Sequence, residues 1–181
     1  MAKGMKYITV ISAVLTILFV ILCQMTSKTG AILALAITFG TITYHFGMRL
    51  LVGTIIDKWL NNKVDYNRKW FQPRSFEEKL YQRLRVKKWK DRMPTYVPGT
   101  FSTKEHTMED IAQAMCQAEI VHEVIIVLSF VPLVLVPIFG EFWVFFITSL
   151  LSAAFDLMFV MMQRYNRPRI VKIIKRKGET L

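Results

Sequence analysis

The sequence has few of the residues that build phosphate loops, metal centres and nucleophile motifs. Its 181 residues include only eight glycines, two cysteines and three histidines. The glycines occur singly, and neither a nucleophile elbow nor a histidine pair at HExxH spacing is present. Cys23 and Cys116 lie in or beside apolar stretches, so we interpret them as small buried hydrophobic residues. The sequence therefore predicts no nucleotide loop and no hydrolase triad, and no residue spacing in it indicates a metal site, although His45, His122 and Glu119 leave that question open.

Acidic residues are also scarce relative to basic ones. The chain has 13 Asp and Glu against 24 Lys and Arg, which gives a net charge of +11. In a soluble protein this balance would suggest nucleic acid binding. Here 53% of the residues are hydrophobic and the basic residues flank apolar segments. The positive-inside effect and anionic headgroups account for such charge, so we expect membrane lipids as partners and no nucleic acid.

Long apolar runs are the dominant feature of the chain. A helix of about 20 residues crosses a hydrocarbon core of about 30 Å. We predict an all-α membrane protein, residues 1–181 forming one integral membrane domain, with a polar loop 57–120 and a basic tail 163–181. The first span is too long in its apolar core for a cleavable signal peptide. The four predicted spans are Tyr7–Thr26, Ala31–Ile56, Val121–Gly140 and Phe142–Met162.

The distribution of Lys and Arg predicts the orientation in the membrane. The loop from Lys58 to Lys104 contains thirteen Lys and Arg, whereas the first short connection has only Lys28 and the turn at Glu141 has none. Short loops rich in Lys and Arg stay on the cytoplasmic side. We therefore expect both termini and the central loop to be cytoplasmic.

The central loop has the pattern of a folded segment rather than a linker. From Ser75 to Arg92 the spacing predicts one amphipathic helix with Phe76, Leu80 and Leu84 on one side. Ser75 is a plausible N-cap, and an apolar face with a basic rim is typical of helices at the membrane interface. A second helix is predicted to begin near Thr107 and to continue into the third span.

Ionisable residues inside or beside the spans are energetically costly and are therefore candidates for function. His45 and Arg49 share a face of the second span, four residues apart. Glu119 and His122 share a face at the cytoplasmic end of the third span, and Asp156 lies within the fourth. A carboxylate beside a histidine orients and charges an imidazole for proton transfer.

Structural roles are the alternative for each of these residues. Arg49 can extend to the headgroups, and Asp156 can neutralise Arg49 or Arg164. His122 can be an interfacial histidine with satisfied hydrogen bonds. Six ionisable groups in one half of the bilayer nevertheless favour a catalytic site over a purely structural bundle.

Three separated motifs resemble the glycosyl-4,4'-diaponeurosporenoate acyltransferase family over roughly residues 40–175. They are 76–94 (FEEKLYQRLRVKKWKDRMP), 118–122 (AEIVH) and 163–169 (QRYNRPR). The family acylates a sugar hydroxyl of a glycosylated carotenoid in Gram-positive bacteria. The resemblance implies a small membrane O-acyltransferase that uses an acyl carrier, here expected to be acyl-CoA as co-substrate, with no further cofactor.

Thioester chemistry assigns expected roles to the candidate residues. A general base must remove the hydroxyl proton, donors must stabilise the oxyanion, and cations must bind the carrier phosphates. We predict His122 as the base, oriented by Glu119, with His45 and Arg49 near the oxyanion or the sugar. The remaining predicted binding residues are Asp156, Trp89, Lys87, Lys88, Lys90, Arg164, Tyr165, Asn166, Arg167 and Arg169.

Two other functions fit parts of the pattern. A non-enzymatic membrane factor would bind anionic lipid or a partner protein through the basic loop. An integral-membrane methyltransferase would also end in a basic, tyrosine-containing motif, but the chain lacks a His-Pro pair, and its Glu-Glu pair, Glu77–Glu78, lies far from that motif. Dispersal of His45, His122 and Asp156 over separate faces would favour the non-enzymatic factor.

Overall fold

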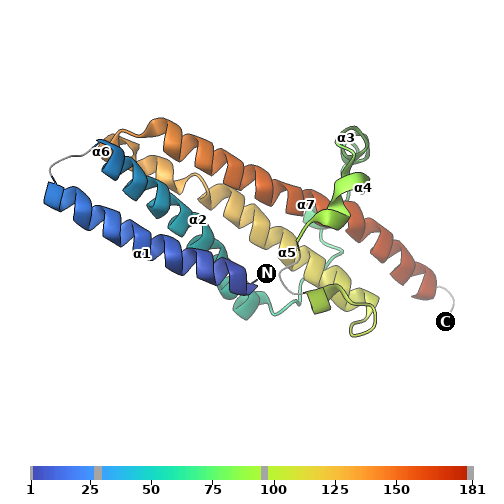
Figure 1. Cartoon of the computed structure of the whole chain (residues 1–181). Coiled ribbons are helices and arrows are strands. Elements are labelled where there is room, and N and C mark those ends of the chain that lie inside the picture. The colour runs from blue at the N-terminus through green and yellow to red at the C-terminus, as the bar shows by residue number, and fades with distance from the viewer. Residues whose placement is uncertain (1, 27–29, 95–97, 179–181) are drawn as a thin grey trace. The chain divides into compact units, whose positions relative to one another are not determined.

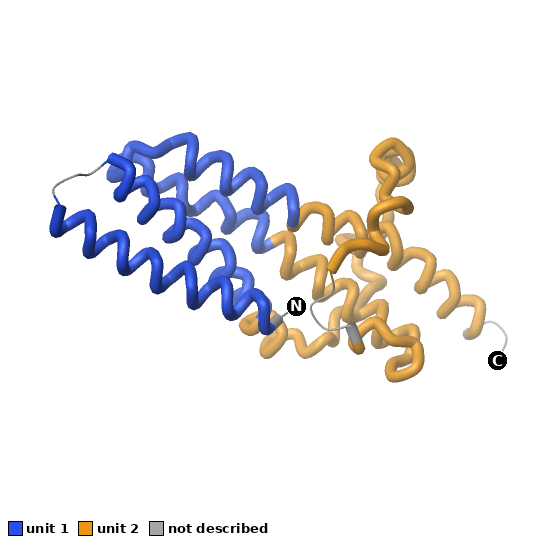
Figure 2. Tube along the Cα trace, viewed as in Figure 1, with its two compact units in different colours: residues 1–53, 124–155 blue, residues 54–123, 156–181 orange. Residues whose placement is uncertain are grey.

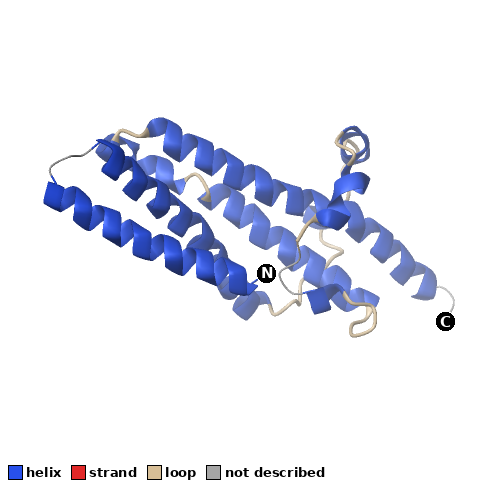
Figure 3. Cartoon of the chain, viewed as in Figure 1, coloured by secondary structure: helices blue, strands red, loops and turns tan. Residues whose placement is uncertain are grey.

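The computed structural model describes residues 2–26, 30–94 and 98–178. The described part of the chain is helical, with no β-strand (Figure 3). Among the described residues, four stretches are long and apolar enough to cross a membrane: Lys3–Thr26, Gly30–Leu60, Met108–Phe139 and Phe142–Lys177. They confirm the predicted all-α class and the predicted number of apolar segments. Lys28, in the first short connection, lies outside the described residues.

The chain divides into two compact units (Figure 2). Unit 1 contains residues 1–53 and 124–155, and unit 2 contains residues 54–123 and 156–181. The long helices are α1 (Ala2–Thr26), α2 (Gly30–Leu60), α5 (Met108–Leu128) and α7 (Phe142–Gly178), labelled in Figure 1. The shorter elements are η1 (Lys69–Phe71), α3 (Glu77–Arg83), α4 (Val86–Trp89), η2 (Lys90–Arg92), η3 (Pro98–Phe101), η4 (Val131–Leu135) and α6 (Val136–Phe139).

In unit 1, α1 and α2 form an antiparallel pair. The rings of Phe19 and Phe39 stack with centroids 5.6 Å apart, and nearer the other end Thr43 donates a hydrogen bond of 2.9 Å to Ser12. A Cβ atom added at Gly40 would lie 3.5 Å from a side chain of α1. Small residues let membrane helices approach closely, because lipid supplies no hydrophobic driving force for their association.

The third apolar segment is broken, although the sequence predicts one continuous span from Val121 to Gly140. α5 ends at Leu128 and is followed by η4 and α6. Pro132 has no N–H to donate to the carbonyl of Leu128, four residues earlier. The hydroxyl of Tyr44 donates to this carbonyl at 2.8 Å instead. A side chain from α2 thus satisfies a backbone acceptor that would otherwise be unpaired in an apolar environment.

In unit 2, the end of α2 is held by α5. Asn61 and Asn62 have φ angles of 46° and 55°, a left-handed conformation that asparagine tolerates well at a helix end. The side chain of Gln117 accepts from the backbone N–H of Asn62 at 2.7 Å and donates to Asp57 at 3.1 Å. These contacts with Gln117 of α5 therefore fix the direction in which the chain continues after the end of α2.

The predicted helix start near Thr107 is confirmed. The backbone N–H of Asp110 donates to the Thr107 hydroxyl at 3.1 Å, and the Asp110 carboxylate accepts from the backbone N–H of Thr107 at 3.0 Å. This reciprocal pair satisfies amide groups that have no intrahelical partner in the first turn. The helix then continues without interruption into the apolar segment, as expected.

The single amphipathic helix predicted for 75–92 is wrong. The segment forms α3, α4 and η2, and the break falls at Arg85, which has a left-handed φ of 51°. The residue before α3 is Phe76, and no side chain caps the helix, so Ser75 is not the N-cap. α7 continues past Met162 to Gly178 as one helix, so the predicted basic tail begins within it.

We predict that Tyr44→Phe lowers the stability of unit 1 by about 1 kcal/mol, because the Leu128 carbonyl loses its donor. In a Pro132→Ala background the same change is expected to cost less, since position 132 then has its own N–H. Thermal or denaturant unfolding in detergent measures both, with Tyr7→Phe on an exposed residue of α1 as the control. Equal costs of Tyr44→Phe in the two backgrounds would contradict the compensation.

Candidate functional site

The α5 and α7 segments of unit 2 bury polar as well as apolar side chains. On α7 the buried polar residues lie at positions 156, 163, 164 and 167, which places them along one helical face. Charged groups are rarely buried unless they are paired. The buried polar residues of unit 2 are Glu77, Gln117, Glu119, Asp156, Gln163, Arg164 and Arg167.

Glu119 is the centre of this polar layer. Its side chain is fully buried, and one carboxylate oxygen accepts from Arg164 at 2.6 Å while the other accepts from Arg167. Arg164 also donates to a carboxylate oxygen of Glu77, at 2.8 Å from Nε and at 2.5 Å from a terminal nitrogen. The two arginines and two glutamates carry formal charges that cancel, so the cluster is neutral as a whole. We call these four residues the buried ion-pair cluster.

The two arginines of the cluster also bind the central loop. Arg164 donates to the carbonyls of Trp70 at 3.0 Å and Gln72 at 3.1 Å, and Arg167 donates to the carbonyl of Phe71 at 2.7 Å. The Arg167 guanidinium also lies 5.0 Å from the centre of the Phe71 ring. The exit motif therefore contacts the central loop, as predicted. Nε and both terminal nitrogens of Arg164 are used within the protein, which argues against its predicted role as a phosphate ligand.

Glu77 is the cluster member that the sequence analysis missed. Its place in a predicted amphipathic helix suggested a solvent-facing charge, but Glu77 and Tyr81, four residues apart, face the cluster. Burial, together with the negative charge of Glu77, raises the pKa of Tyr81 to about 12, so the phenol stays neutral at physiological pH. Glu77 and Tyr81 lie four residues apart in the first motif, and this spacing could have indicated that they share one face of a helix.

One turn along α5, His122 pairs with Asp156 of α7. Nδ1 of His122 lies 2.8 Å from Oδ1 of Asp156, whose side chain is only 1% exposed, whereas that of His122 is 21% exposed. The imidazole stacks on the ring of Phe159 with centroids 4.4 Å apart and an interplanar angle of 4°. The expectation that Glu119 orients His122 is therefore wrong, because Asp156 makes that contact and both oxygens of Glu119 are bound to arginine.

This geometry selects one tautomer of His122. An ionised Asp156 accepts a hydrogen bond from Nδ1, so the proton of the neutral imidazole is on Nδ1. The lone pair is then on Nε2. Within the described part of the chain, no hydrogen bond to Nε2 is present. Phe159 restricts ring rotation, so Nε2 keeps a fixed direction. An oriented, partly exposed imidazole backed by a buried carboxylate is the arrangement of a general base.

His45 and Arg49, the two other predicted ionisable residues, belong to unit 1. Arg49 donates to the carbonyl of His45 at 2.9 Å and to the hydroxyl of Ser152 at 2.8 Å. The Ser152 hydroxyl lies 2.8 Å from that of Ser129, at the break after α5. The edge of the His45 ring contacts Tyr44, with centroids 5.5 Å apart. These side chains form a polar network within unit 1.

The remaining predicted binding residues are more exposed. Lys90 pairs with its neighbour Asp91 at 2.6 Å, and Nε1 of Trp89 donates to the carbonyl of Leu84 at 3.1 Å. The Arg169 guanidinium lies 4.0 Å from the centre of the Tyr165 ring. Three further residues have exposed or partly exposed side chains and are candidates for ligand contact: Lys87, Lys88 and Asn166.

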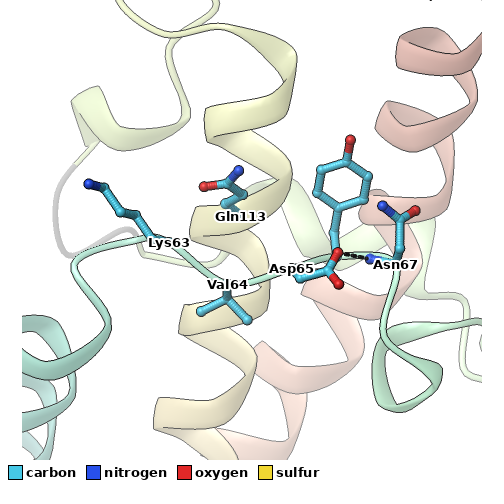
Figure 4. A pocket seen from close by; sticks show the side chains of 6 residues that line it. Lys63, Val64, Asp65, Asn67 and Gln113 are labelled. Atoms are coloured by element: carbon cyan, nitrogen blue, oxygen red, sulfur yellow. Dashed lines mark hydrogen bonds between the residues drawn. The ribbon is translucent and has the colours of Figure 1, made fainter.

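An open pocket of about 570 Å³ lies elsewhere on unit 2, between the chain after α2 and Gln113 of α5 (Figure 4). Its lining includes Lys63 and Asp65, and the Asp65 carboxylate accepts from the backbone N–H of Asn67 at 2.9 Å. None of the predicted site residues lines it. Among the residues that the structure describes, no group of three or more His, Cys, Asp or Glu is placed to hold a metal ion.

Fold and site together define a multi-pass helical membrane protein with an oriented histidine beside a neutral, buried ion-pair cluster. A family model described as glycosyl-4,4'-diaponeurosporenoate acyltransferase matches residues 67–176, and the chain belongs to this family of acyltransferases, which act in carotenoid glycoside modification. No curated protein and no solved structure matches the chain. His122, Asp156 and the ion-pair cluster lie inside the matched residues, whereas His45 and Arg49 precede them.

We predict that Arg164→Lys destabilises unit 2 by roughly 1–3 kcal/mol, although the charge is kept, because lysine lacks the planar fork that reaches several acceptors at once. Hydrogen exchange of the 70–77 backbone, which Arg164 binds, should increase in the same variant. Arg68→Lys, at an exposed position in the same unit, is the matched control. Equal behaviour of the two variants would show that only charge matters at position 164.

Proposed function

We propose that the protein transfers a fatty acyl group from an acyl carrier, expected to be acyl-CoA, to a hydroxyl of a glycosylated lipid such as a carotenoid glycoside. The observation that carries this proposal is the His122–Asp156 pair, whose geometry suits proton removal from a hydroxyl. The family match supports the transferase class and the glycoside acceptor.

In the proposed reaction, Nε2 of His122 removes the proton from the acceptor hydroxyl as its oxygen attacks the thioester carbonyl carbon. Asp156 stabilises the imidazolium that forms. The carbon–sulfur bond then breaks, and the thiolate takes the proton from His122, so the base is regenerated. The new bond is an oxygen ester and the other product is the free thiol of the carrier.

Exposed cations are the proposed contacts for the carrier phosphates. Lys87, Lys88 and Arg169 have exposed side chains, in contrast to Arg164 and Arg167. Phosphate groups bind such cations through charge-assisted hydrogen bonds. The buried ion-pair cluster has a different proposed role, since it holds α5, α7 and the loop so that His122 is correctly placed. Glu119 is thus a positioning residue rather than a direct participant.

We also propose a bacterial cell membrane location with both termini and the central loop on the cytoplasmic side. Soluble acyl carriers are made in the cytoplasm, and the density of Lys and Arg in the central loop agrees with that side. The carrier would then approach from the cytoplasm, while the lipid acceptor arrives within the membrane.

We predict that His122→Ala lowers turnover by about two to four orders of magnitude, the usual contribution of a general base. Asp156→Asn is expected to lose most activity too, because an amide donating to Nδ1 would leave the proton on Nε2. Transfer from labelled acyl-CoA to a carotenoid glycoside by purified enzyme measures both. Glu119→Gln should act chiefly on stability.

The matched control is His106→Ala, which removes the third histidine at an exposed position. It should leave turnover unchanged. Near-normal turnover in a folded His122→Ala variant would rule out the proposed base. Greater kinetic damage from Glu119→Gln than from Asp156→Asn, at equal stability, would transfer the role to Glu119.

Cysteine accessibility tests the orientation. A cysteine replacing Lys90 should resist a membrane-impermeant maleimide in intact cells and react after permeabilisation. A cysteine replacing Glu141, in the turn before α7, should react in intact cells. Labelling in the opposite pattern would reverse the orientation and remove the cytoplasmic donor from the proposal.

A further inference from the structure

The outward face of α3 is apolar, which is unusual for a short helix in a polar segment. Phe76, Leu80 and Leu84 are 54%, 37% and 44% exposed, although they are the residues with the strongest tendency to be buried. They recur every four residues and so form one continuous stripe. We call these three side chains the α3 stripe. Nearby, the Trp70 side chain is 55% exposed.

The orientation of α3 is imposed by the buried ion-pair cluster. Glu77 is held by Arg164, and Tyr81, which lies above Glu77 on the same face, contacts Tyr165 edge to face with centroids 6.0 Å apart. The α3 stripe lies beside this anchored face and remains exposed. Rotation of the helix to bury the stripe would separate Glu77 from Arg164 and leave buried charges unpaired.

The level of α3 relative to the membrane follows from its partner on α7. The apolar run of α7 ends at Met162, and Arg164 comes two residues later. At about 1.5 Å rise per residue, Arg164 lies within a turn of the end of that run, at the depth of the headgroups. Because Glu77 bonds directly to Arg164, α3 lies at the same depth, to one side of α7 (Figure 1).

The charges around the stripe have the sign that a bilayer surface attracts. Lys79, Arg83 and Arg85 of the α3–α4 segment are all exposed, against Glu78 as the exposed acidic residue of α3. A helix with an apolar face and a basic rim lies in the interface plane, and its binding strengthens with anionic lipid.

We propose that the α3 stripe inserts into the membrane interface and that its basic rim binds anionic headgroups, so that α3 is an in-plane anchor of unit 2. The anchor is connected to the catalytic region through Arg164 and Glu119, one turn from His122. The occupant of the stripe is lipid of the same membrane rather than a protein partner. This inference rests on the spans and on the α3 contacts, and it holds whether or not His122 is the base.

Site-specific photocrosslinking tests the anchor in the full-length protein. A benzophenone amino acid replaces Leu80 in one variant and Gln82 in the other, two exposed positions about 200° apart around the same helix. Both are reconstituted in nanodiscs of phosphatidylcholine with or without phosphatidylglycerol, and adducts are identified by mass spectrometry. We expect lipid adducts at position 80 to exceed those at position 82 several-fold, and to increase with anionic lipid.

A charge-reversed variant, Lys79→Glu with Arg83→Glu, separates the two parts of the proposal. It should abolish the dependence on phosphatidylglycerol while lipid adducts at position 80 persist at a lower level. Equal lipid labelling at positions 80 and 82 would overturn the proposal, as would crosslinked dimers of the chain in place of lipid adducts. Because the readout is lipid contact, its failure is distinguishable from a loss of acyl transfer.

Discussion

The fully buried carboxylate of Glu119 is the constraint on which unit 2 depends. A buried carboxylate is costly unless it is paired, and Arg164 and Arg167 of α7 bind both oxygens of Glu119. These arginines introduce two more charges, which need Glu77 and the carbonyls of three consecutive loop residues, 70–72. One buried charge on α5 thus fixes α7, the loop after η1 and the face of α3. Such a network stabilises a particular arrangement more than it adds to total stability, because the desolvation of its members offsets most of the attraction between them.

The same polar layer explains how His122, the proposed base, is held in place. His122 is three residues after Glu119, so the register set by the ion-pair cluster also sets the position of the imidazole. Asp156 and Phe159, on the facing side of α7, restrain the ring by a hydrogen bond and by stacking. Stability and chemistry are therefore assigned to neighbouring carboxylates: Glu119 is fully bound to arginine, and Asp156 contacts the histidine. The region matched by the acyltransferase family contains both.

In unit 1 the polar groups lie among apolar helices, and their hydrogen-bond partners come from neighbouring helices. The hydroxyl of Tyr44 compensates for the missing N–H of Pro132, and Arg49 binds Ser152 next to the break after α5. The close approach of α1 at Gly40 and the stacked rings of Phe19 and Phe39 supply packing where lipid gives no hydrophobic drive. In both units, polar contacts between helices thus fix register, alongside a core of buried apolar side chains.

The sequence by itself determined the helical class, the four apolar segments, the start of α5 at Thr107 and the family. These properties depend on local composition, spacing and motif order, which can be read directly from the amino-acid sequence. It also named His122, Glu119, Asp156, Arg164 and Arg167 as important. It could not show which of them pair, because the partners lie 34 to 48 residues apart and several carboxylates compete for each cation. The break of the predicted 75–92 helix and the burial of Glu77 were equally hidden. The sequence indicated an interfacial helix with Glu77 among its solvent-facing charges, and only the tertiary structure decided otherwise, because the buried charge of Arg164 is paired with Glu77 as well as with Glu119.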